Sequence, residues 1–131
     1  MGRPVVLSNG QLFVGLNENG LVNDFYYPYV GLENLSSARL SPHKIGVWAD
    51  NSFSWTDDGS WQITVDFDES ALISYITIKS DARQIELTLR DFIDVHHNSL
   101  VRTINIANKT NRAREIRLFM HQVFEISRHG R

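Results

Sequence analysis

The chain has 131 residues, a size that suits one domain with its own hydrophobic core. Thirteen lysines and arginines stand against fifteen aspartates and glutamates, and a net charge of −2 gives no basic footprint for nucleic acid. Without cysteine there are no disulfides and no thiolate ligands. The sequence shows neither a long apolar run nor a secretory signal, so we expect a cytoplasmic protein with no nucleic-acid or membrane partner.

The N-terminal part is predicted to form hairpins. In "VVLSNGQLFVGL" the dipeptide Asn9-Gly10 separates two short apolar runs, and "LFVGLNENGLVNDFYY" repeats the pattern with Asn19-Gly20. Asn-Gly supplies the positive φ values that tight hairpin turns require. The stretch "HKIGVWADNSFSW" predicts a third hairpin that turns at Asp50-Asn51.

Period-two alternation continues through the rest of the chain. In "WQITVDFD", Trp61 and Phe67 share one face with the aliphatic residues between them, and Asp66 and Asp68 share the other. Four more strands are predicted, in "LISYITIKS", "RQIELTLRDFIDVHH", "LVRTINIAN" and "EIRLFMHQVFEIS", with turns at Ser80-Asp81, Asn98-Ser99 and residues 108–111. Roughly nine strands without a helical period predict an all-β fold, an antiparallel β-sandwich, as one domain over residues 1–131.

The last segment is open to two interpretations. "REIRLFMHQVFEI" also allows a short helix, but its content of Ile, Leu, Phe and Val favours a strand buried on both faces. The chain then stops at "EISRHGR", directly after an apolar strand and without a cap or tail. We therefore expect the sequence to be a piece of a longer protein.

Two groups of carboxylates are candidates for chemistry. Asp66 and Asp68 lie about 7 Å apart by the strand rise, inside the window of roughly 6.5–9.5 Å for an inverting glycosidase pair. They lie on the polar face, however, and we interpret them as solvated. Asp91 shares its parity with apolar neighbours and is predicted to point inward, where backbone amides or an arginine such as Arg102 would satisfy it, unless a bulge turns it outward.

Metal and covalent chemistry find little support. "DFIDVHHNS" gathers Asp91, Asp94, His96 and His97, but adjacent histidines on a strand point to opposite faces. No phosphate-binding glycine loop, nucleophile elbow or His-Glu-x-x-His motif occurs. We expect no catalytic residue, no metal and no cofactor in this chain.

The stretch "DFYYPYVGLEN" is unusually aromatic for a loop. Its tyrosines Tyr26, Tyr27 and Tyr29 surround a stiffening proline, and Glu33 and Asn34 follow. Either the rings close one end of the core, or they are held out for a partner or ligand. We predict a contact surface for a partner domain. Glu33 and Asn34 at its end could hydrogen-bond across to the partner or reach the edge of its substrate pocket.

Three tryptophans form the second aromatic group. Trp48, Trp55 and Trp61 lie within fourteen positions of one another. Trp61 is in register with the core face, which favours burial. Sugars bind aromatic rings through their apolar faces, so Trp48 and Trp55 are candidates for an interface or for the edge of a substrate site.

Longer stretches resemble a known family. "LFVGLNENGLVNDFYYPYVGLEN", "HKIGVWADNSFSW" and "DGSW", followed by "LRDFIDVHHNSLVRTINIANKT" and "RLFMHQVF", resemble the start of bacterial and archaeal glucoamylase-type enzymes of glycoside hydrolase family fifteen. The resemblance implies a supersandwich of the galactose-mutarotase type that precedes an (α/α)6 barrel. It also implies that both catalytic glutamates lie in that barrel, to which no part of this chain corresponds.

Three functions remain compatible with the sequence. The first is a non-catalytic N-terminal domain that packs against the catalytic barrel of a glycosidase acting on α-glucans or trehalose. The second is a stand-alone carbohydrate-binding module that holds an α-glucan on the same aromatic residues. The third is an assembly module that forms a homo-oligomer through sheet edges or through the tyrosine loop.

Overall fold

A computed structural model describes residues 5–27 and 43–122, and within these ranges the chain forms ten β-strands and no helix. The strands are β1 (Val5–Ser8), β2 (Phe13–Leu16), β3 (Val22–Tyr26), β4 (Lys44–Ala49), β5 (Ser52–Trp55), β6 (Gln62–Asp68), β7 (Ile73–Ser80), β8 (Ile85–Asp94), β9 (Ser99–Asn108) and β10 (Ile116–His121). The predicted all-β fold is confirmed, with ten strands where roughly nine were expected. None of the described segments is a helix long and apolar enough to cross a membrane.

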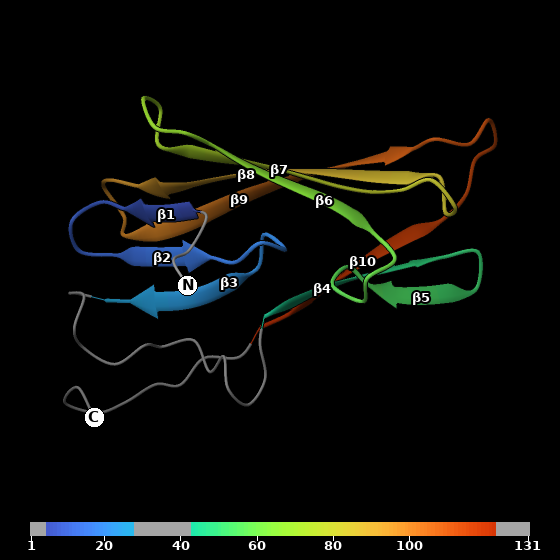
Figure 1. The fold of residues 1–131 in the computed structure, drawn as a ribbon, viewed down its shortest axis with the longest axis horizontal. Helices are drawn as coiled ribbons and strands as arrows, with labels where there is room; N and C mark the ends of the chain where they lie inside the picture. The colour runs from blue at the N-terminus through green and yellow to red at the C-terminus, as the bar shows by residue number, and fades with distance from the viewer. Residues whose placement is uncertain (1–4, 28–42, 123–131) are drawn as a thin grey trace.

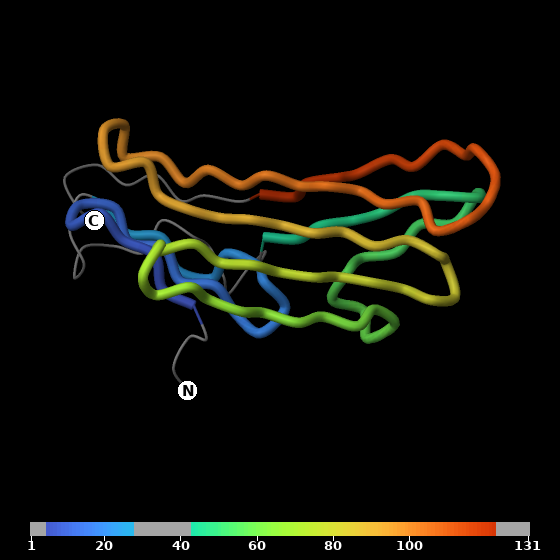
Figure 2. The backbone as a smooth tube through the Cα atoms, turned by 90° about the horizontal axis from the view of Figure 1, so that it is seen from above, coloured from blue at the N-terminus to red at the C-terminus, as the bar shows by residue number. Residues whose placement is uncertain are grey.

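The strands form three antiparallel sheets. One sheet has the order β1-β2-β3, a second β10-β4-β5, and the largest β6-β7-β8-β9. Figure 1 shows the two three-stranded sheets at opposite ends of the molecule, with the strands of the large sheet running along its length. The same long, flattened outline is seen from above in Figure 2. The inner faces of all three sheets share one hydrophobic core, as expected for an antiparallel β-sandwich.

The hairpin turns lie where the sequence predicts them. Gly10 and Gly20 both have positive φ, at 96° and 70°. Asp50 and Asn51 form the two-residue turn between β4 and β5, with φ of 51° and 59°. Positive φ at both central positions is typical of a type I′ turn, whose twist matches that of the strands. Asn98, φ 48°, marks the predicted turn between β8 and β9.

The core is aliphatic and lies on the alternate positions that the period-two pattern assigns to it. Trp61 is 7% exposed, which confirms its predicted place on the core face. The fully buried side chains come from every sheet; they are Leu7, Leu12, Leu16, Ile45, Ile76, Ile78, Ile85, Leu87, Leu89, Val5, Val14 and Val47.

The last described strand differs from its prediction. β10 is a strand, as expected, but it is not buried on both faces: Phe119 and Met120 are 45% and 43% exposed. The reason is its place in the sheet. In the described part of the chain β10 pairs only with β4, so it lies at an edge of its sheet. Phe119 and Met120 point to opposite faces, so both faces of the strand are open near its end.

Candidate functional site

The outer face of the sheet β10-β4-β5 carries a cluster of aromatic rings. Ile45 and Val47 point from β4 into the core, so the alternate positions of this strand point outward. The antiparallel registers place Gly46 between Trp55 of β5 and Phe119 of β10. We call this surface the aromatic face; its residues are Lys44, Gly46, Trp48, Phe53, Trp55, Arg117, Phe119 and His121.

The rings of the aromatic face contact one another edge to face. The ring centroids of Phe53 and Trp55 are 4.9 Å apart at an interplanar angle of 89°. Phe119 joins Phe53 at 5.6 Å, and His121 joins Trp55 at 6.2 Å. Such tilted pairs are favourable because the positive edge of one ring meets the negative face of the next. These rings pack against one another at steep angles, and none of these three pairs is stacked in parallel planes.

Gly46 lies directly beneath the rings of Phe53 and Trp55. A Cβ atom at this position would overlap the Phe53 ring and come within 3.1 Å of Trp55. The glycine therefore lets both rings lie down against the backbone of β4. Its φ is not in the left-handed region, so the requirement is space rather than backbone conformation.

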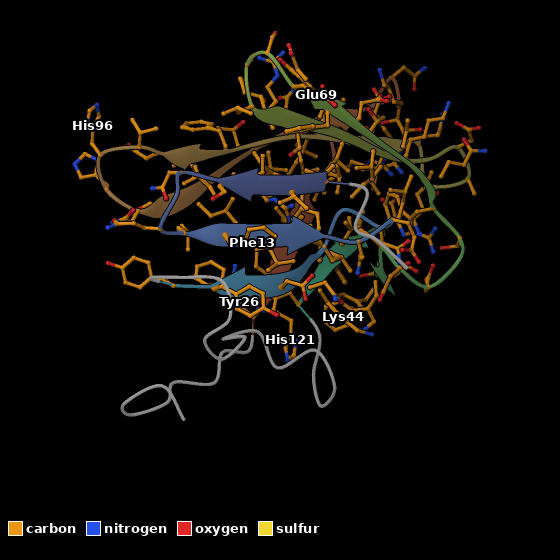
Figure 3. The ribbon with its side chains drawn as sticks, turned by 60° about the vertical axis from the view of Figure 1, so that its left-hand side comes forward. Phe13, Tyr26, Lys44, Glu69, His96 and His121 are labelled. Atoms are coloured by element: carbon orange, nitrogen blue, oxygen red, sulfur yellow. The ribbon has the colours of Figure 1, made fainter. Side chains whose placement is uncertain are left out.

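Charged side chains border the aromatic face. Lys44 lies over the Trp55 ring, with Nζ 5.6 Å from the centroid, and forms an ion pair with Asp57 at 3.7 Å. Arg117 lies 4.9 Å from the centroid of Trp48 and pairs with a neighbouring glutamate at 2.7 Å. Both cations are thus balanced by acids, and each covers one tryptophan. Figure 3 shows Lys44 and His121, register partners on β4 and β10, beside each other.

Two rings of this face are exposed to solvent. Phe53 and Phe119 are 44% and 45% exposed, although both are large apolar side chains. An apolar centre surrounded by a charged border is the usual anatomy of a protein–protein contact. Trp48 and Trp55, both candidates from the sequence, are only partly exposed and belong to this face.

The tyrosine segment begins on a different sheet. Tyr26 ends β3 and packs on Phe13 of β2, with ring centroids 5.8 Å apart, as Figure 3 shows. Tyr27 follows and is 44% exposed. The other three candidates of this segment, Tyr29, Glu33 and Asn34, lie outside the described residues.

The acid pair on β6 lies where the sequence places it. Asp66 is exposed on the outer face of the large sheet. Asp68 accepts hydrogen bonds from the hydroxyl of Ser70 at 2.8 Å and from the amides of Ser70 and Ala71. The Ser70 hydroxyl, and then the Ala71 amide, lower the pKa of Asp68 below its ordinary value. A general acid needs a raised pKa, so this pair is unsuited to glycoside hydrolysis.

Asp91 is fully buried and paired, as the sequence predicts. The carboxylate accepts hydrogen bonds from Nε and Nη2 of Arg102, at 2.6 and 2.9 Å. Ser74 donates to the same carboxylate at 2.9 Å, and Arg102 also donates to the carbonyl of Gly20 at 2.7 Å. The network joins the β2–β3 turn to the large sheet, and it leaves Asp91 no free oxygen for a substrate.

The histidine cluster is confined to the β8–β9 turn. Asp94 accepts a hydrogen bond from the amide of His96 at 2.7 Å and contacts Nδ1 of His97 at 3.1 Å. The His96 amide is the main cause of the lowered pKa of Asp94, followed by His97. Figure 3 shows His96 at the tip of the turn. Across the described ranges, 5–27 and 43–122, no three potential ligands gather to hold a metal ion.

Sequence reasoning missed a shallow groove on the outer face of β8 and β9. It has a volume of about 300 Å³ and is lined by Thr88, Arg90, Thr103, Ile104 and Asn105. The guanidinium of Arg90 also lies 5.5 Å from the ring centroid of a tyrosine on β7. Period-two alternation predicts that these polar residues face outward. It does not predict that those of β8 lie next to those of β9 and together line a groove.

The structure is thus an antiparallel β-sandwich with a cluster of exposed aromatic rings on one sheet. In sequence, the chain is similar to an uncharacterized glycosyl hydrolase of Methanocaldococcus jannaschii, with 28% identity over 121 residues. The match covers 92% of this chain but only 18% of that protein, so the chain spans about a fifth of its length. No family model and no solved structure matches the chain.

Proposed function

We propose that this chain is the non-catalytic β-sandwich domain of a glucoamylase-type glycosyl hydrolase, packed against an (α/α)6 barrel that hydrolyses α-glucosidic bonds. The observation that carries the proposal is the aromatic face, an exposed cluster of rings with a charged border. The similarity to a glycosyl hydrolase more than five times longer than the match supports the presence of such a partner domain.

The acids of the described residues support the non-catalytic role. The carboxylate of Asp91 accepts hydrogen bonds from Arg102 and Ser74. Asp66 is exposed, and Asp68 has a lowered pKa, which disfavours proton donation at neutral pH. The buried carboxylate of Asp91 thus serves the packing of the sandwich through its ion pair with Arg102.

The aromatic face is the docking surface in this proposal. Phe53, Phe119 and Trp55 supply the apolar centre, and the paired charges of Lys44 and Arg117 supply the rim. Rings that already contact one another lose little conformational freedom on binding, which favours a stable contact. The tyrosine segment 26–34 is proposed as a second contact, since Tyr27 is held exposed at the end of β3.

A hydrolysis assay tests the non-catalytic role. Maltose, maltodextrin and trehalose are incubated with residues 1–131 alone and with the full-length protein that carries them. The proposal expects turnover only by the longer protein. Turnover by residues 1–131 that disappears in the Asp66→Asn or Asp68→Asn variant would overturn it.

A paired substitution tests the docking surface. Phe53→Ser with Phe119→Ser should lower the Tm and activity of the longer protein, while leaving the Tm of residues 1–131 nearly unchanged. The matched control is Gln62→Ser with Thr64→Ser, two exposed positions on the outer face of β6. Equal loss in the isolated chain would assign the rings to its own folding, and no loss in the longer protein would exclude the face as the contact.

A second candidate function is carbohydrate binding, favoured by the groove on β8 and β9. Thr88, Thr103 and Asn105 offer hydroxyl and amide groups, and Arg90 adds a charged donor. Titration calorimetry of residues 1–131 with maltodextrin tests it. Binding that is lost in Asn105→Ala, but kept in the Phe53→Ser variant, would favour this function and place it apart from the aromatic face.

A further inference from the structure

Both Asn-Gly dipeptides of the chain lie in hairpin turns. Asn9-Gly10 lies between β1 and β2, and Asn19-Gly20 lies between β2 and β3. Asparagine is a thermolabile residue, since the next backbone nitrogen can attack its side-chain amide. A following glycine favours that attack because it has no Cβ to obstruct the approach. The two turns therefore offer the same chemistry in two different surroundings.

The attacking nitrogen is hydrogen-bonded in both turns. The amide of Gly10 donates to the hydroxyl of Ser8 at 3.1 Å, and the amide of Gly20 donates to the carbonyl of Asn17 at 2.9 Å. Each nitrogen must give up one hydrogen bond before it can attack. Gly10 is exposed and Gly20 is buried, so the nitrogen by itself favours reaction in the first turn.

The side-chain amides under attack differ far more. Oδ1 of Asn9 accepts hydrogen bonds from two backbone amides of its own turn, at 3.0 and 2.8 Å. Its Nδ2 donates to the side chain of Asn98 at 2.7 Å and to the carbonyl of Asp94 at 3.3 Å. The side-chain amide of Asn19 makes no hydrogen bond to any described residue. Ring closure must break four hydrogen bonds at Asn9 and none at Asn19, which outweighs the difference at the nitrogen.

We propose that Asn19 is a site of spontaneous deamidation in the folded protein, and that its hydrogen bonds protect Asn9. The nitrogen of Gly20 forms a bond to Cγ of Asn19, and the bond from Cγ to Nδ2 breaks. Ammonia leaves with the proton that the Gly20 nitrogen gives up, and a cyclic imide remains. Water then opens the imide at either carbonyl. Opening at Cγ gives aspartate, and opening at the main-chain carbonyl gives isoaspartate, whose backbone contains one additional methylene group.

An additional backbone atom at this site would disturb a close contact. The carbonyl of Gly20 accepts a hydrogen bond from Nη2 of Arg102 at 2.7 Å, and Gly20 itself lies against Ile76. Isoaspartate at position 19 would shift that carbonyl away from Arg102, the cation that pairs with the buried Asp91. The modification would therefore weaken the link between the β2–β3 turn and the large sheet. This inference does not depend on the proposed function.

Peptide mass spectrometry after incubation in warm, mildly alkaline buffer tests the proposal, because an acid and an amide differ in mass. Deamidation of the folded chain should be at least about tenfold faster at Asn19 than at Asn9, since breaking one typical hydrogen bond slows a reaction by about that factor. In the urea-unfolded chain, the control, the two sites should react at similar rates. Equal rates in the folded chain, faster reaction at Asn9, or no reaction at Asn19 would overturn the proposal.

A substitution at Asn98 tests the protection of Asn9. Asn98→Gly removes the acceptor at 2.7 Å, and glycine adopts the φ of 48° at this position without strain. Deamidation at Asn9 should rise by at least about threefold, and that at Asn19 should stay the same. An unchanged rate at Asn9 would overturn the protective role of its hydrogen bonds.

Thermal unfolding tests the effect on the turn. The isoaspartate form of the aged chain, identified by its resistance to a protease that cuts before aspartate, should have a lower Tm than the parent. Asn19→Asp is the matched control, because it adds the same charge without lengthening the backbone, and its Tm should stay close to that of the parent. Equal Tm values for the isoaspartate form and Asn19→Asp would overturn the predicted weakening of the contact with Arg102.

Discussion

Asp91 and Arg102 form a buried ion pair that the residue type alone would disfavour. The carboxylate is 0% exposed, and the arginine side chain 11%. Removing two charges from water is costly, and the hydrogen bonds from Ser74 and to Gly20 offset part of that cost. A buried ion pair adds little to the free energy of unfolding compared with apolar residues of similar size. Removing only one of its partners is strongly destabilising, because the other charge stays buried and unpaired.

Arg102→Met should therefore lower the free energy of unfolding by about 3–5 kcal/mol, because it leaves the Asp91 carboxylate buried without a cation. Urea titration followed by tryptophan fluorescence measures this loss. The matched control is Arg117→Met, whose exposed ion pair with Glu115 should matter by under about 1 kcal/mol. Equal losses of unfolding free energy in the two variants would contradict the prediction that a buried, unpaired carboxylate costs more than an exposed one.

Asp58 ends a chain of hydrogen bonds that begins at the buried indole of Trp61. The indole Nε1 of Trp61 donates to the hydroxyl of Ser54 at 2.9 Å, and that hydroxyl donates to Asp58 at 2.5 Å. Ser60 donates to the other carboxylate oxygen at 2.5 Å. The hydroxyl of Ser54, followed by that of Ser60, lowers the pKa of Asp58 below its ordinary value.

A lowered folded-state pKa gives stability that is full above the unfolded pKa, about 3.9 for aspartate, and is lost as the pH falls through the folded value. Asp58→Asn should lack this component. The difference in unfolding free energy between the parent and the variant should shrink below about pH 4. Asp66→Asn is the control, since the Asp66 carboxylate accepts no hydrogen bond within the described residues. A difference that grows on acidification would contradict the role of Asp58.

At the scale of elements, the β2–β3 turn is fitted to the large sheet by a glycine. Gly20 has a φ of 70°, and a Cβ there would lie 2.8 Å from Cδ1 of Ile76. Gly10, in the β1–β2 turn, also has a positive φ, of 96°, but has open space around it. Substitution of Gly10 therefore tests the cost of positive φ alone, whereas substitution of Gly20 tests that cost together with crowding against Ile76.

Gly10→Ala should destabilise by about 1–2 kcal/mol from backbone strain alone. Gly20→Ala should cost a further 1–3 kcal/mol or so, because the new methyl group pushes against the buried Ile76 side chain. Thermal unfolding of both variants measures the difference. Similar Tm values would mean that Ile76 moves aside without cost.

At the scale of the whole molecule, Arg114 connects the large sheet to the sheet of the aromatic face. Its side chain is 4% exposed. Nη2 donates to the carbonyls of Arg83 and Gln84, both at 2.7 Å, in the β7–β8 turn. Nη1 donates to Asp50 in the β4–β5 turn at 2.8 Å, and Nε to Asn108 at the end of β9 at 3.0 Å. One guanidinium thus holds three turns together.

Arg114→Ala should lower the free energy of unfolding by about 2–4 kcal/mol, since charged hydrogen bonds are worth about 1.5–3 kcal/mol each and some carbonyls can turn to water. Arg112→Ala is the matched control. Arg112 donates to the same Asp50 carboxylate at 2.9 Å but is 56% exposed, so its loss should be under about 1 kcal/mol. Equal losses in urea titration would show that Asp50, rather than the junction of three turns, matters.

The sequence by itself determined the local features of this protein. The Asn-Gly and Asp50-Asn51 turns follow from residues that tolerate positive φ, and the inward positions of Trp61 and Asp91 follow from period-two alternation. The sequence left backbone amides or an arginine such as Arg102 open as partners of Asp91, and the observed register of β8 and β9 places Arg102 opposite it.

Only the tertiary structure decided which strands meet. β10 pairs with β4, about seventy residues earlier in the chain, and this pairing brings Phe119 beside Gly46 and Phe53. It also decided that, among the described strands, β10 and β9 are the edge strands of their sheets. A strand's own pattern reports which side chains share a face, but it says nothing of the neighbouring strand. That choice depends on how the three sheets close over one core, which is a property of the whole chain.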